Sequence, residues 1–73
     1  MNFNYVKIDH SDIRKVIGKT VKIRDKIDGQ EWVGALIAYS PPTAYIDYLE
    51  GQVVSIDINS EKEVYVLTTD SVR

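Results

Sequence analysis

The chain has 73 residues with a net charge of −2, one histidine and no cysteine. This length predicts a single domain, residues 1–73, and the composition excludes disulfide bonds, thiolate metal sites and most zinc sites. No apolar run approaches the roughly 18 residues of a membrane-spanning helix, and residues 1–7 do not resemble a secretory leader, so we expect a cytoplasmic protein without a membrane partner.

Two short elements are predicted at the start of the chain. Alternating side chains over residues 3–8 predict an edge strand. Residues 11–17 predict a helix of barely two turns, with Ser11 as its N-cap and Gly18 at the left-handed position that ends it. The apolar stripe of this helix consists of Ile13, Val16 and Ile17. Because so short a helix is unstable alone, we expect it to pack on a sheet.

Five strands are predicted in the rest of the chain, where apolar residues recur at every second position. They span residues 20–27, 30–39, 44–49, 52–58 and 63–69. Asp28-Gly29 predicts a tight hairpin, and Gly34 predicts a bend or bulge. The fold class is therefore α+β and mainly β, with a short helix and a five- or six-stranded, bent antiparallel sheet that closes into a small barrel.

The second and third of these strands resemble the first sequence motif of the Sm-like proteins, small barrels related to SH3-like barrels. The matching positions are Gly34, Leu36, Tyr39, Tyr45 and Asp47. In the Sm-like family an Asp and an Asn of this motif help to form a uridine pocket, and here those positions are Ser40 and Ala44. The basic-Gly pair of the second motif has no counterpart near residues 59–62. The resemblance thus implies the barrel without its RNA pocket.

The sequence contains little that indicates catalysis. His10-Ser11-Asp12 combine the residue types of a catalytic triad, but neighbours on a chain cannot take its geometry, and we interpret them as a helix cap. The four glycines are dispersed and form no phosphate loop, so we expect no cofactor. We therefore expect a non-enzymatic binding or assembly module.

Tyrosines and prolines gather between residues 39 and 48. Aromatic-lined grooves beside prolines bind peptides, although tyrosines also fill the cores of small barrels. We predict a partner-binding site formed by Tyr39, Pro41, Pro42, Tyr45 and Tyr48. The leading function is then protein–protein contact, as a small regulator or inhibitor of a larger complex.

The charges are divided unequally along the chain. Residues 1–24 carry six basic and two acidic side chains, a net +4, whereas residues 25–73 carry three basic and nine acidic ones, a net −6. Either the two sets interleave in space, or the molecule has a basic and an acidic face. A basic face would offer RNA or DNA binding as the alternative function, with weak and salt-sensitive phosphate contacts. Its candidate residues are Arg14, Lys15, Lys19, Lys22, Arg24 and Lys26.

Self-association is the last expectation. A core of this size is expected to supply only about 3–5 kcal/mol, and open sheet edges invite pairing. Residues 64–67 are apolar on both faces, and Val53-Val54 offers a similar segment. Homo-oligomers could form by pairing of such strands or by contact between oppositely charged faces, and only the second route is screened by salt.

Overall fold

Six strands and one short helix make up the fold. The computed structural model describes residues 2–49 and 51–70. The elements in chain order are β1 (Asn2–Ile8), the 3-10 helix η1 (His10–Val16), β2 (Thr20–Asp25), β3 (Glu31–Ser40), β4 (Thr43–Leu49), β5 (Gln52–Asp57) and β6 (Lys62–Asp70). All strands lie in one antiparallel sheet of order β1-β6-β2-β3-β4-β5. The prediction of a mainly β fold with a six-stranded antiparallel sheet is confirmed.

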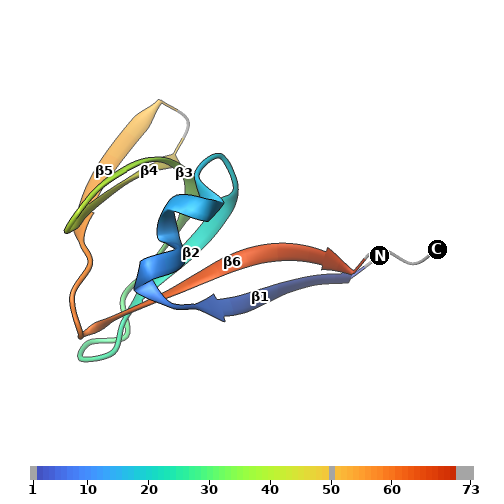
Figure 1. Cartoon of the computed structure of the whole chain (residues 1–73), viewed down its shortest axis with the longest axis horizontal. Helices are drawn as coiled ribbons and strands as arrows, with labels where there is room; N and C mark the ends of the chain where they lie inside the picture. The colour runs from blue at the N-terminus through green and yellow to red at the C-terminus, as the bar shows by residue number, and fades with distance from the viewer. Residues whose placement is uncertain (1, 50, 71–73) are drawn as a thin grey trace.

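The sheet bends strongly but keeps two edges. Figure 1 shows β3, β4 and β5 folding over toward η1, with β2, β6 and β1 forming the other half. In the part of the chain that the structure describes, β1 pairs only with β6 and β5 pairs only with β4, so no ladder closes the sheet into a barrel. The expected closure is therefore not found, and the sheet is open.

The core lies inside the bend, between the two halves of the sheet and η1. Alternate residues of the strands enter it, because successive side chains of a strand point to opposite faces. The core consists of Ile13, Val16, Val21, Ile23, Leu36, Ala44, Ile46, Ile56, Ile58, Val64 and Val66. Trp32 and Tyr39 pack against it and are partly buried. The other face of the sheet is thereby left to solvent.

The helix differs from the prediction in type and in its start. It is a 3-10 helix preceded by Asp9, and no side chain caps it, so the expected N-cap role of Ser11 is wrong. A 3-10 helix has three residues per turn, which places side chains three apart on one face and turns the next one away. Ile13 and Val16 are accordingly buried, whereas Ile17 follows the end of the helix with an extended backbone and is 44% exposed.

The predicted irregularity in β3 occurs, but not at Gly34. The register of β3 against β4 shifts between Leu36 and Ala38, so Ile37 is the extra residue of a bulge. Gly34 itself lies where β4 approaches β3 closely, because a Cβ there would collide with the backbone oxygen of Asp47 and the side chain of Ile46. The glycine is thus required by close approach rather than by a bend.

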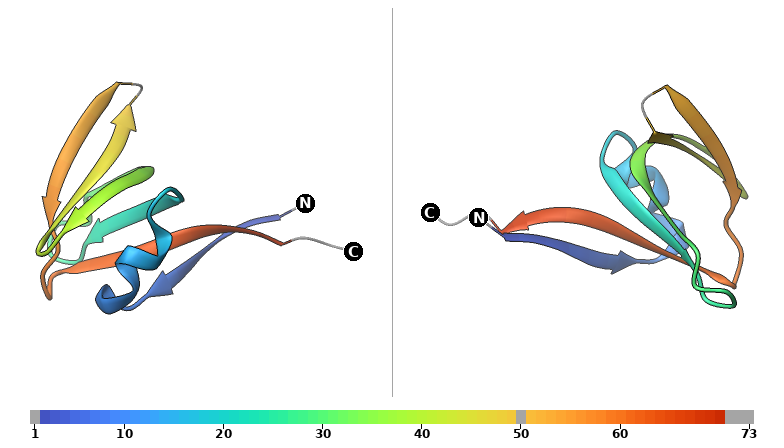
Figure 2. Two further views of the ribbon diagram at one scale, coloured as in Figure 1. Left: turned by 45° about the horizontal axis from the view of Figure 1, so that its top comes forward. Right: turned by 180° about the vertical axis from the view of Figure 1, so that it is seen from behind.

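The last strand lies inside the sheet and not at its edge. β6 pairs with β1 on one side and with β2 on the other, which explains why residues 64–67 are apolar on both faces. Its pairing with β2 ends at Val66, whereas its pairing with β1 continues to Asp70. Beyond Val66 the two strands project as a two-stranded arm, visible in Figures 1 and 2. The edge strand with an apolar pair is instead β5.

Candidate functional site: the outer face of the sheet

The outer face of β3, β4 and β5 carries a group of apolar side chains that are exposed or, in the case of Tyr45, partly exposed. Alternation points Leu36, Ala44 and Ile46 into the core and their neighbours outward. The outward group, called here the apolar sheet face, consists of Val33, Ile37, Tyr45, Tyr48 and Val53. Of these, Ile37 is 47% and Val53 55% exposed. Exposed apolar groups that lie next to one another are typical of interaction surfaces.

Strand register brings these side chains together. Ala35, Asp47 and Val53 form one row across β3, β4 and β5. The neighbouring row pairs Ala38 with Tyr45 and Tyr45 with Ser55. The two β-bulges, at Ile37 in β3 and at Tyr48 in β4, each add one exposed apolar residue beside these rows. Ile37 and Tyr48 are the two apolar residues at which the alternation between inward and outward side chains fails. This failure is the sequence signal that could have located the apolar sheet face.

Asp47 is the polar member of this face. Its carboxylate oxygen Oδ1 is buried and accepts no hydrogen bond from the residues that the structure describes. An acceptor in this state costs about 1–3 kcal/mol, because it has lost water without gaining a donor. The carboxyl group of Asp47, at the centre of the apolar sheet face, therefore lowers the stability of the free protein.

The structure separates the predicted tyrosine–proline site into parts. Tyr39 points to the core side, where the guanidinium of Arg14 lies 5.9 Å from its ring centroid. Tyr45, paired with Ala38, points to the outer face instead. Pro41 and Pro42 are exposed in the turn between β3 and β4, joined by a cis peptide bond. Of the five predicted residues, only Tyr45 and Tyr48 belong to the apolar sheet face.

The other half of the outer face is charged and internally paired. The ammonium of Lys22 lies between two tyrosine rings, 4.6 Å from the centroid of Tyr5 and 5.2 Å from that of Tyr65. Arg24 lies 3.9 Å from Glu31 and 3.8 Å from Glu63. These cations from the basic N-terminal part are therefore paired with carboxylates or placed over aromatic rings, which strand pairing brings close.

Two half-buried carboxylates have lowered pKa values. The backbone N–H of Ile27 donates to Asp25, and this bond, with the ammonium of Lys62 at 3.3 Å, holds the pKa of Asp25 below its ordinary value against the opposing effect of burial. Burial also raises the pKa of Glu63, but the hydroxyl of Tyr65 and the ammonium of Lys7 donate to it and lower the pKa overall. Both groups are thus stabilised as anions by the fold.

The six predicted nucleic-acid residues do not gather on one surface. Arg14 and Lys15 belong to η1 on the core side of the sheet, where Lys15 pairs with Asp12 at 3.2 Å. Lys22 and Arg24 are on the opposite face and are paired there. Lys19 and Lys26 form no ion pair with any residue that the structure describes, and they lie in two different connections. The pattern of charges is one of interleaving.

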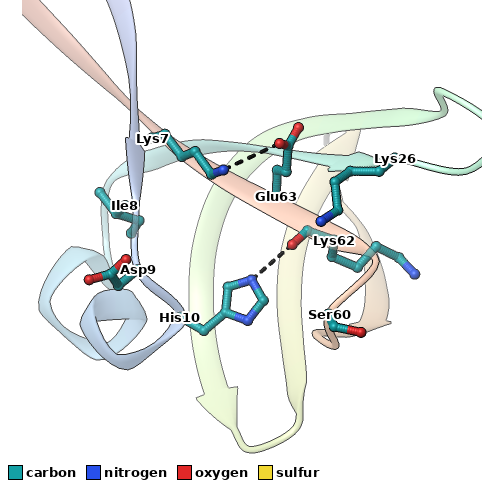
Figure 3. Close-up of a pocket in the computed structure, with 8 residues that line it drawn as sticks. All are labelled: Lys7, Ile8, Asp9, His10, Lys26, Ser60, Lys62 and Glu63. Carbon is teal, nitrogen blue, oxygen red and sulfur yellow. Dashed lines mark hydrogen bonds and ion pairs between the residues drawn. The ribbon is translucent and has the colours of Figure 1, made fainter.

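A pocket of about 330 Å³ opens where β1 meets η1 and the β5–β6 connection. Figure 3 shows His10 at the bottom of the view, with Lys7 and Glu63 above it and Lys26 to the upper right. The ring nitrogen Nε2 of His10 lies 2.8 Å from the carbonyl oxygen of Lys62 and therefore carries the proton that it donates. His10 ties η1 to β6, so its hydrogen bond is structural.

Comparison of the chain with protein-family models, with curated proteins and with solved structures finds no match. No helix within residues 2–49 and 51–70 is long and apolar enough to cross a membrane. Among those same residues, no three His, Cys, Asp or Glu side chains are grouped as metal ligands would be.

Proposed function

We propose that this chain is a non-enzymatic module that binds a partner protein through the apolar sheet face, and that it acts as a small regulator or inhibitor of the complex containing that partner. The observation that carries the proposal is the clustering of exposed Ile37, Tyr48 and Val53 on one side of a small sheet. Aromatic and aliphatic side chains of this kind form the centres of protein interfaces. The cysteine-free composition supports a cytoplasmic location.

Asp47 adds a second argument for binding at this face. Replacing an unpaired carboxylate with an apolar side chain stabilises a free protein, so a carboxylate placed in an apolar surface at a cost to stability favours a role in binding. A partner that donates a hydrogen bond there would satisfy the carboxylate and be selected for that chemistry. The strongly bent sheet also supports relating the chain to small barrels of the Sm-like kind.

Protein contact is favoured over RNA or DNA binding by the arrangement of the cations. Nucleic-acid affinity depends on lysines and arginines that can displace the counterions of several phosphates. Here Lys15, Lys22 and Arg24 already have carboxylate partners, and the candidates lie on both sides of the sheet. A phosphate backbone would have to displace these partners on one side and could not reach the other.

The experiment is an affinity capture from the native cell with three forms of the chain. Ile37→Asp places a charge on the apolar sheet face, and Ile27→Asp is the matched control in the β2–β3 turn, where Ile27 is 74% exposed. We expect a protein that is retained by the wild type and by Ile27→Asp and lost with Ile37→Asp. Capture that is equal for all three forms, or that disappears on nuclease treatment, would contradict the proposal.

A further inference from the structure

The outer edge of β5 is a row of backbone groups without partners. Figures 1 and 2 show β5 as the outermost strand at its end of the sheet. It contains no proline and no lysine, and its side toward β4 is its only paired side within the described residues. Proline, lysine and bulges are the usual devices that prevent an edge strand from pairing. The other edge, β1, does carry a lysine, Lys7, whose side chain is 61% exposed.

One observed hydrogen bond determines which residues of β5 bond to β4 and which point their backbone groups to the open edge. The N–H of Ile58 donates to the carbonyl of Pro42 at 2.6 Å, and these two residues continue the register in which Asp57 faces Thr43. In an antiparallel ladder, hydrogen-bonded pairs alternate with non-hydrogen-bonded pairs. Ile56 and Val54 therefore bond to β4. The N–H and C=O groups that point to the open edge belong to Val53, Ser55 and Asp57.

We propose that two copies of the chain pair through β5, antiparallel and centred on Ser55, to form a symmetric dimer with one continuous sheet. In this register Ser55 faces Ser55 of the second copy, and Val53 faces Asp57 of the second copy. All three residues have their N–H and C=O groups free at the edge, so the new ladder is fully hydrogen-bonded at each of these pairs. The two-fold axis makes the same surface of each copy serve both sides.

The side chains support this register over its neighbours. On the core side it sets Val54 against Ile56 of the second copy, so two apolar pairs extend the core across the interface. Shifting the centre to Val54 would set Gln52 against Ile56 instead. Shifting it to Ile56 would set each Asp57 against Ser55 of the second copy and bring the two Asp57 carboxylates to diagonal positions about 7–8 Å apart, close enough for their like charges to repel. Centring on Ser55 keeps them about 13 Å apart at a strand rise of about 3.3 Å per residue.

The dimer has a consequence for the apolar sheet face. Val53 and Tyr45 lie on the outward side of β5 and β4, and the pairing places the faces of the two copies side by side on one continuous sheet. The interface itself stands on the edge of β5 and not on that face. It can therefore be tested without reference to the proposed partner protein.

Replacing Ser55 by proline tests the edge directly. A proline is tolerated on an edge strand where the missing N–H pointed to solvent, and it blocks any strand from pairing there. We expect light scattering to give twice the chain mass of 8.3 kDa for the wild type at both low and high salt, and the single mass for Ser55→Pro with an unchanged circular dichroism spectrum. Val54→Pro is the control, because its N–H bonds to β4, and it should unfold the chain.

A charge pair tests the register without depending on proline. Ser55→Asp and Ser55→Lys each place like charges opposite each other at the two-fold axis, so each variant alone should be monomeric. An equal mixture of the two should restore the double mass at low salt, because Asp then faces Lys. A monomeric wild type, a dimeric Ser55→Pro, or a mixture that stays monomeric would overturn the proposal.

Discussion

Gly34 gives the sharpest test of how tightly β3 and β4 pack. In most strands a Gly→Ala change stabilises by about 0.4–1 kcal/mol, because the unfolded chain loses freedom. At Gly34 the added Cβ meets the backbone oxygen of Asp47 and the side chain of Ile46. The side chain can move, but the backbone oxygen belongs to the ladder in which Ala35 faces Asp47. A Gly34→Ala change that destabilises the protein, instead of stabilising it, would therefore demonstrate this contact.

The expected magnitude follows from the cost of overpacking. Forcing a methyl group into a packed site costs about 1–3 kcal/mol, which exceeds the gain from the unfolded state. For a domain of this size, each kcal/mol lowers the Tm by about 4–8 °C. Since the core is expected to supply only about 3–5 kcal/mol, Gly34→Ala should remain folded but melt well below the wild type.

Thermal and urea unfolding, followed by circular dichroism at low protein concentration, measure this effect. Ala38→Val is the matched control, because Ala38 is exposed on the same strand and an added branch there should change stability by no more than about 0.5 kcal/mol. A Gly34→Ala variant as stable as the wild type would refute the reasoning, since it would show that β4 can withdraw from β3 at no cost.

Three further changes probe single polar groups. Asp47→Val should raise the free energy of unfolding by about 1 kcal/mol in urea titrations, because it removes an unpaired acceptor, and should weaken capture of the partner protein. The free energy of unfolding should decline as the pH falls below about 4. Asp25 and Glu63 have lower pKa values in the folded state than in the unfolded state, so the unfolded chain binds protons more readily. Asp25→Asn should therefore make this decline shallower. His10→Ala should cost about 1 kcal/mol through the loss of the hydrogen bond to the Lys62 carbonyl, and a variant with wild-type stability would show that this bond contributes nothing.

The strands were predictable from the sequence because each has its own alternation. All six lie within two residues of their expected ends, and the β2–β3 hairpin occurs with Gly29 at a φ of 78°, although residues 26–30 separate the strands and the turn is longer than predicted. The type of the helix could not be predicted, because the spacing of Ile13, Val16 and Ile17 matches one face of an α-helix, whereas the 3-10 helix ends at Val16 and leaves Ile17 exposed. The local pattern of apolar residues therefore predicts where a helix lies more reliably than whether it is an α-helix or a 3-10 helix.

The order of the strands and the candidate surface could not be predicted in the same way. Apolar residues on both faces of residues 64–67 are equally compatible with a central strand and with a paired edge, and only the long-range ladder with β1 decides between them. The same holds for the charges, because Lys7 and Glu63 are 56 residues apart in the sequence and 3.3 Å apart in space. Tyr39 and Tyr45 were separated by a bulge that no single residue announces.

The arm formed by β1 and β6 determines how the molecule responds to force. Asn2 faces Asp70 at its tip, and the ladder runs from there to Ile8 and Val64. Tension applied between Asn2 and Asp70 pulls the two strands apart at right angles to their length. It therefore breaks the hydrogen bonds of the ladder one pair after another, beginning at the tip, instead of loading all of them at once. The arm should yield first and at low force. Resistance should rise where the opening reaches Val66, since β6 is held there by β2 as well and its side chain enters the core.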